Sequence, residues 1–230
     1  MPLFKSPKNL NCIRVDMLFL RNQGLKAPDP ENRREAIRKI TESIDICKRV
    51  RCSVCAESFI ALGVLLHDGN QAVRFEALSA IDWFYNSNWP VDCLKREILP
   101  LLRDRNKSIR DEAARILSYS NLDDDFISEI FDLLSDNNPS ARFVSVKVLS
   151  LFAERLNFQQ LCSLLENITD GCAGYANTDL WIEINDRLTD TSKLKIAELL
   201  SCGNPKMRNI ANEFLLSTGG EYLIETYASR

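Results

Sequence analysis

Apolar residues recur along this chain at spacings of three and four, which is the period of a helix with one buried face. The spacing is clearest in four stretches: Phe59, Leu62, Leu65 and Leu66; Leu94, Ile98, Leu101 and Leu102; Phe126, Ile130, Leu133 and Leu134; and Leu194, Ile196, Leu199 and Leu200. Each stretch is followed by a polar turn and a second segment of helical spacing. The pattern therefore predicts successive pairs of amphipathic helices.

A short motif recurs where the two helices of a pair meet. It reads Asp, a turn containing Asn or Pro, an apolar residue, Arg, a small residue three positions after Arg and an aliphatic residue seven after it. The arginines are Arg33, Arg74, Arg110, Arg142 and Arg208. Three copies carry the aspartate, namely Asp68, Asp104 and Asp136, whereas Ala27 and Cys202 replace it in the first and last copies.

The two positions after each arginine predict how the helices pack. The small residues are Ala36, Ala77, Ala113, Ser145 and Ala211, which allow neighbouring helices to approach closely. The aliphatic residues are Ile40, Ile81, Leu117, Leu149 and Leu215, which supply core volume. A single helix pair of this size cannot bury its apolar face, so we expect the pairs to stack into an α-solenoid.

The spacing of the arginines predicts one further, degenerate pair. The intervals are 41, 36, 32 and 66 residues, and the last is twice 33. Two helical segments, Phe158–Glu166 and Thr178–Leu188, fill this gap. We therefore expect a single domain over residues 1–230. Its approximate units are 8–47, 50–86, 89–120, 122–155, 157–188 and 190–217, with a C-terminal cap at 218–230.

Over residues 27–217 the pattern resembles HEAT repeats, particularly the short bacterial type. The resemblance implies an all-α fold, a right-handed α-solenoid of about six stacked HEAT-like helical hairpins. It also implies that Asp and Arg bond along the stack of turns, a structural ladder of Asp68 with Arg74, Asp104 with Arg110 and Asp136 with Arg142. Since Ala27 and Cys202 depart from the motif, we expect this ladder to be interrupted at both ends.

Composition indicates the compartment. No stretch reaches the roughly 18 apolar residues of a membrane span, and Met1–Asn11 contains no apolar signal-peptide region. We therefore expect a cytoplasmic protein with eight reduced cysteines and no membrane partner.

The net charge of −3 is unevenly distributed along the chain, with +6 over residues 1–55 and −9 over residues 56–230. Such asymmetry can steer a charged partner, although solvated helix faces are the favoured interpretation.

Candidate chemistry is sparse. The glycine-loop nucleotide motifs are absent. Cys47, Cys52 and Cys55 form C-x4-C-x2-C, which suits zinc or redox chemistry but has no second CxxC, so buried thiols are the favoured interpretation. His67 beside Asp68 could form a catalytic couple, but the turn needs that aspartate. We therefore expect no cofactor, no metal and no catalytic residues.

Two other segments have both a structural and a functional interpretation. Residues 82–89 are rich in aromatic residues; we expect Phe84 and Tyr85 to pack between helices, and Trp83 and Trp89 to pack or to contact a ligand. The acidic run 123–125 precedes an apolar helix, so we expect it to cap that helix rather than bind metal.

In HEAT-like solenoids the second helices usually line the concave side. The positions one and five residues after each arginine are then exposed there. From these positions and the aromatic segment we predict a protein-binding face made of Phe75, Trp83, Asp111, Arg115, Phe143 and Lys147. Charge reversal at Arg115 and Lys147 together with Phe75→Ala should weaken partner capture and leave the melting temperature nearly unchanged.

The sequence therefore favours a non-enzymatic protein-binding module, an adaptor or an inhibitor, with an immunity-like role in the second group. Its partner is expected to be another protein. The alternative is a HEAT-like enzyme, either an alkylpurine DNA glycosylase, with Asp82, Trp83 and Trp181 as candidate groups, or a phycobilin lyase. The sequence pI of about 5.4 argues against binding to nucleic acid.

Overall fold

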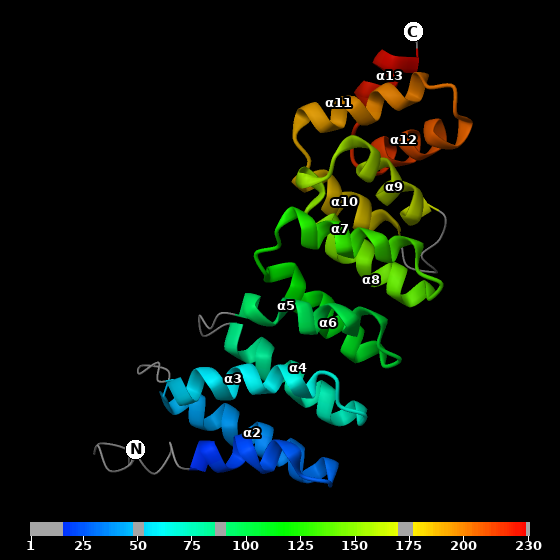
Figure 1. Cartoon of the computed structure of the whole chain (residues 1–230). Helices are drawn as coiled ribbons and strands as arrows, with labels where there is room; N and C mark the ends of the chain where they lie inside the picture. Colours follow the sequence, from blue (N-terminus) through cyan, green and yellow to red (C-terminus); the bar gives the residue numbers. More distant parts are fainter. Residues whose placement is uncertain (1–15, 48–52, 86–90, 170–176, 229–230) are drawn as a thin grey trace. The chain divides into compact units, whose positions relative to one another are not determined.

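The computed structural model describes residues 16–47, 53–85, 91–169 and 177–228, and every regular element in these ranges is a helix (Figure 1). The prediction of an all-α chain is therefore confirmed for this part of the chain. None of the helices in these ranges is long and apolar enough to cross a membrane. The chain divides into two compact units, Met1–Asn121 and Leu122–Arg230, and each is described by itself.

Unit 1 places its long helices side by side. Helical residues 16–22 precede the 3-10 turn η1 (Gly24–Lys26), α2 (Pro30–Cys47), α3 (Ser53–Leu65), α4 (Gln71–Tyr85), η2 (Val91–Leu94), α5 (Lys95–Ile98), η3 (Leu99–Arg103) and α6 (Lys107–Tyr119). Helix α2 packs on α4, and α4 packs on α6, so these three helices form one layer. Helix α3 contacts α2, α4 and α5 from the other layer.

Unit 2 contains α7 (Asp124–Asp132), η4 (Leu133–Ser135), α8 (Pro139–Ser150), η5 (Ala153–Arg155), α9 (Phe158–Thr169), α10 (Asn177–Arg187), α11 (Asp190–Glu198), η6 (Leu199–Ser201), α12 (Pro205–Ser217) and α13 (Glu221–Ala228). Helices α9 and α10 lie where the sequence predicts the degenerate pair, and α13 lies in the predicted cap. The helices α5, α7 and α11 all end in a 3-10 turn, a tighter last turn that is common at helix ends.

The core follows the predicted register closely. Every small residue three positions after Arg and every aliphatic residue seven after it is at most 2% exposed. The predicted core residues of α3, of η2 to η3, and of α7 with η4 are also buried.

The register that the sequence predicts for α11 is wrong. Leu194 is 43% exposed, whereas Ile196 and Ala197 are fully buried. Two residues apart on a helix differ by about 200° in direction, so Leu194 and Ile196 cannot share one face. Leu199 and Leu200 are half-buried.

An asparagine caps the second helix in four copies of the motif, a role that the sequence analysis did not assign. Each side-chain oxygen accepts a hydrogen bond from the backbone N–H two residues on; these asparagines are Asn70, Asn106, Asn138 and Asn204. Where Asp is present two residues earlier, its Oδ1 accepts the amide of the capping asparagine, at 2.8 Å in all three cases. Asp and Asn together therefore fix the turn and the start of the helix.

Each motif arginine bonds to the backbone of its own turn. Its Nη1 donates to the carbonyl oxygen six residues earlier, at 2.6 to 2.8 Å; the acceptors are Ala27, Asp68, Asp104, Asp136 and Cys202. The bond forms whether that residue is Asp, Ala or Cys, because the acceptor is a backbone atom.

The aspartate side chain instead pairs with the arginine of the preceding copy. Arg33 donates to both carboxylate oxygens of Asp68, at 2.7 and 2.9 Å. Arg74 does the same with Asp104, at 2.7 and 3.1 Å. This planar two-bond geometry is the strongest pairing that a guanidinium and a carboxylate make.

The predicted pairs Asp68 with Arg74, Asp104 with Arg110 and Asp136 with Arg142 do form hydrogen bonds, in each case to the backbone carbonyl oxygen of the aspartate. The expected interruption at Ala27 is wrong, because the carboxylate for Arg33 comes from Asp68 in the next copy.

Candidate functional site

The predicted binding residues fall in both units. Phe75 and Trp83 lie on α4, and Asp111 and Arg115 lie on α6, all in unit 1. Phe75 and Trp83 are each 40% exposed, as the sequence predicts. On α8 in unit 2, Phe143 is half-buried and Lys147 is exposed.

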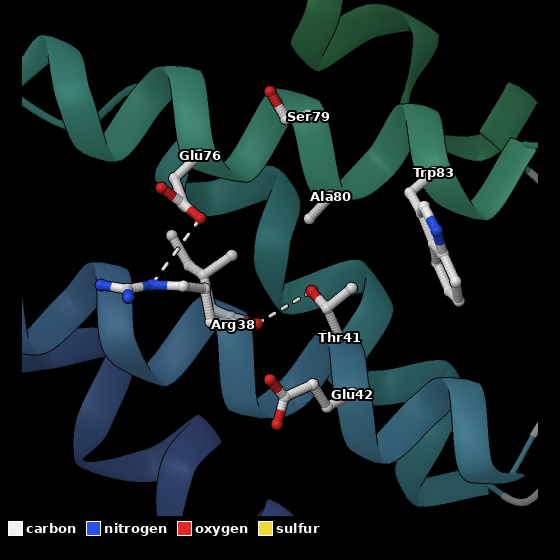
Figure 2. A pocket seen from close by; sticks show the side chains of 8 residues that line it. Arg38, Thr41, Glu42, Glu76, Ser79, Ala80 and Trp83 are labelled. Atoms are coloured by element: carbon white, nitrogen blue, oxygen red, sulfur yellow. Dashed lines mark hydrogen bonds and ion pairs between the residues drawn. The ribbon is translucent and has the colours of Figure 1, made fainter.

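A pocket of about 290 Å³ lies between α2 and α4. Figure 2 shows the side chains that line it. Trp83 reaches from α4 toward α2 at one end, and the pair of Arg38 and Glu76 lies at the other. Thr41 and Glu42 on α2, and Ser79 on α4, complete its polar lining. Its apolar lining consists of Ile37 and Ala80, which are 1% and 7% exposed.

Two arginines of α2 share the carboxylate of Glu76 on α4. Arg34 Nη2 lies 3.2 Å and Arg38 Nε 3.8 Å from Glu76 carboxylate oxygens. Both arginines also pair with Glu31, at 2.8 and 2.9 Å. The hydrogen bond that Arg34 donates to Glu76, followed by the charge of Glu31, raises the pKa of Arg34 above its ordinary value. The cationic groups at this end of the pocket are therefore already neutralised.

Arg115 forms a second charged cluster, between α6 and α4. Its Nη2 lies 2.6 Å from Glu112 Oε1 and 2.7 Å from Asp82 Oδ2. The hydrogen bonds that Arg115 donates to Glu112 and then to Asp82 raise the pKa of Arg115. The Asp82 side chain is only 13% exposed, and its Oδ1 is buried without a hydrogen-bond partner. Arg115 therefore joins two helices, a structural role that the sequence analysis did not predict.

Aromatic contacts hold Trp83 in place. Its ring packs edge-on against Phe84, with centroids 5.3 Å apart, and Phe84 packs edge-on against Phe59 at 5.5 Å. Tyr85 stacks on Tyr119 at 5.4 Å and donates a hydrogen bond to its carbonyl oxygen at 2.9 Å. The predicted packing of Phe84 and Tyr85 is confirmed, whereas Trp89 lies outside the described residues.

The other candidate groups have structural surroundings. The Asp68 carboxylate is occupied by Arg33 and the Asn70 amide. Asp123 Oδ1 accepts from the Phe126 amide, so the predicted N-cap is confirmed. Trp181, a group of the enzyme alternative, is 2% exposed and packs edge-on against Phe214 in unit 2. Its ring is therefore not available to a flipped base.

The cysteine cluster is only partly described. Cys55 is fully buried, which agrees with the interpretation as a packed thiol. Cys52 and the Cys47 side chain lie outside the described residues. Burial first, and the carboxylates of Glu97 and Glu166 second, raise the pKa values of Cys93 and Cys162. A raised pKa leaves less thiolate, so these two cysteines are poor nucleophiles.

Sequence analysis missed Arg38, Glu42 and Glu76 as pocket residues. Arg38 and Ser79 occupy the position five residues after the motif arginine, which the repeat pattern predicts to be exposed, but the pattern does not predict a pocket between α2 and α4. Glu76 lies two positions after Arg74, a position to which the pattern assigns no role. The spacing of residues along one helix predicts which side of that helix is buried, whereas the pocket depends on how two helices pack against each other.

No known protein family matches the chain, and no curated protein matches it. One solved structure similar to the chain is that of an engineered protein, with a TM-score of 0.45 and 15% sequence identity over 90% of this chain and 96% of that one. Similarity at this level carries no argument about fold or function.

Proposed function

We propose that the chain is a HEAT-like, right-handed α-solenoid that acts as a non-enzymatic protein-binding module. In this proposal the second helices of the pairs line the concave face, and α2, α4 and α6 belong to it. The module serves as an adaptor or as an inhibitor of its partner. The buried positions around each motif arginine and the Arg–Asp pairs between consecutive copies support the stacked arrangement.

The observation that carries the binding role is the pair of exposed aromatic side chains on α4. Phe75 and Trp83 are both 40% exposed. Trp83 also lines one end of a pocket that has Arg38 and Glu76 at its other end. Aromatic groups among charged ones are typical of the few residues that supply most of the affinity of a protein interface.

The enzyme alternative has less support. The Asp82 side chain is paired with Arg115 and only 13% exposed, and Trp181 is 2% exposed, so neither side chain is accessible to an extruded base. A base-excising site needs an aromatic face and a carboxylate that both reach the extruded base. The geometry therefore favours the binding module.

Photo-crosslinking tests the binding role directly. Benzoylphenylalanine replaces Phe75 in one variant and Tyr222 in a matched control, because Tyr222 is 66% exposed on α13 in unit 2. Both full-length variants are irradiated in lysate of the source organism. We expect a discrete protein adduct from position 75 that excess wild-type chain competes away. Equal adducts from both positions, or none from position 75, would contradict the proposal.

A further inference from the structure

We propose that the pocket between α2 and α4 binds one cationic side chain of the partner protein, a lysine or an arginine, with Trp83 and Glu42 as its recognition residues. This inference rests on the proposed function and adds the chemistry that the partner must present.

The charge balance among the described residues around the pocket favours a cation over an anion. Arg38 lies 2.9, 3.3 and 3.8 Å from carboxylate oxygens of Glu31, Glu35 and Glu76, so its charge is already compensated. Glu42 is exposed and forms no hydrogen bond or ion pair with the part of the chain that the structure describes. Within that part of the chain, the Glu42 carboxylate therefore has no counter-charge.

Trp83 supplies the second recognition element. The face of an indole attracts a cation placed within about 6 Å of its centre, more strongly than other aromatic rings do. The edge-on contact with buried Phe84 fixes the Trp83 ring before any ligand arrives. A fixed ring loses little conformational entropy on binding.

The size and lining of the pocket suit a single long side chain. Small-molecule sites are commonly about 300–1,000 Å³, so a pocket of about 290 Å³ lies at the lower end of that range. Its buried residues Ile37 and Ala80 are apolar. Lysine and arginine carry an apolar stem below a charged head, and can place the stem against these residues while the head stays near solvent.

Each recognition residue should contribute modestly, because both are exposed. A cation–π contact at an exposed site corresponds to about two- to fivefold in affinity, and an exposed ion pair to about fivefold at most. The pocket therefore selects a side chain within a larger interface rather than holding a free ligand tightly.

NMR titration of the ¹⁵N-labelled full-length chain tests the inference. The probes are the Nα-acetyl methylamides of lysine, of norleucine, which has a similar stem without the charge, and of glutamate. Loss of one indole N–H signal in Trp83→Phe assigns the Trp83 resonance. We expect the lysine probe to shift that resonance and the amides of Thr41 and Ser79, and the other two probes to leave them unchanged.

Two variants sharpen the result. Glu42→Gln should weaken binding of the lysine probe severalfold, whereas Glu198→Gln, at an exposed carboxylate on α11 in unit 2, should not change it. Equal shifts with norleucine, preference for glutamate, or no pocket shift at the solubility limit of the lysine probe would each overturn the inference.

The crosslinking result separates this inference from the proposed function. A partner captured at position 75 together with no response to the lysine probe would retain the binding module and reject the cationic side chain. Selective binding of the lysine probe with no captured protein would retain the pocket and reject the module.

Discussion

The carboxylate of Asp68 is held by Arg33, thirty-five positions earlier in the chain, and not by Arg74, six positions later. Arg74 donates its hydrogen bond to the backbone carbonyl oxygen of Asp68, at 2.8 Å, and acts on the carboxylate through its charge alone. The same aspartate thus joins two copies of the motif, one through its side chain and the other through its backbone.

Double-mutant cycles should distinguish these two contacts. Arg33→Ala with Asp68→Ala should show a coupling energy of about 1–3 kcal/mol, because both side chains are largely buried and form two hydrogen bonds. Arg74→Ala with Asp68→Ala should show a much smaller value, because the carbonyl acceptor remains after substitution. Urea unfolding of the three single variants, the two double variants and the wild type measures both, and equal coupling energies would contradict this assignment.

Acid should remove the contribution of Asp68. Burial alone raises its pKa, but the hydrogen bonds from Arg33 and the Asn70 amide lower it below the ordinary 3.8. A carboxyl group whose pKa is lower in the folded than in the unfolded state stabilises the fold at any pH above its unfolded-state pKa. That contribution is lost as the pH falls through the folded-state pKa. The cost of Asp68→Asn should therefore shrink below pH 3.8, as measured by unfolding across a pH series. A cost independent of pH would disagree with this linkage.

Gly63 should not accept a branched side chain. A Cβ at this position would lie 2.8 Å from Leu94 Cδ2, and Leu94 is itself buried. Forcing extra atoms into a packed contact costs about 1–3 kcal/mol, so Gly63→Val should lower the free energy of unfolding by that amount. Gly69→Val is the matched control, because a Cβ there meets nothing within 4 Å. Comparable losses in the two variants would show that the close approach of α3 to Leu94 is not the cause.

Charge reversal at Arg115 should reduce stability, contrary to the sequence-based expectation that the melting temperature stays nearly unchanged. Arg115→Glu would place a third carboxylate beside Asp82 and Glu112 and remove the partner of a mostly buried oxygen. Loss of such a partner costs about 1–3 kcal/mol. Lys147→Glu and Phe75→Ala remove no ion pair that the structure describes, so each should stay within about 0.5 kcal/mol. Thermal unfolding of the three single variants checks this order.

The sequence predicts burial well where burial depends on the geometry of a single helix. A residue three or seven positions after Arg is buried because the helix period places it on the core side, whatever partner it meets. The same rule identified Phe75 as exposed. It was misleading at Leu194, where four leucines and isoleucines in seven positions allow more than one register.

The features that the sequence did not predict arise between helices. The partner of the Asp68 carboxylate depends on how consecutive turns are placed in space, and it is the arginine that lies farther away along the sequence. The Arg115–Asp82 pair and the pocket beside Trp83 likewise depend on the contact of one helix with the next. Spacing within one segment contains no information about these distances.

The bond from each motif arginine to the carbonyl six residues earlier has a consequence for mutational tolerance. Since every residue type carries a backbone carbonyl, a copy with Ala27 or Cys202 in place of aspartate closes its turn with the same bond. The carboxylates of Asp68 and Asp104 pair with the arginine of the preceding copy and also accept the amide of the capping asparagine in their own turn. Loss of such an aspartate therefore weakens a junction and removes one hydrogen bond of the turn, but leaves the arginine bond in place. A chain built in this way can accept substitutions at its junctions one at a time, while each turn keeps one of its closing bonds.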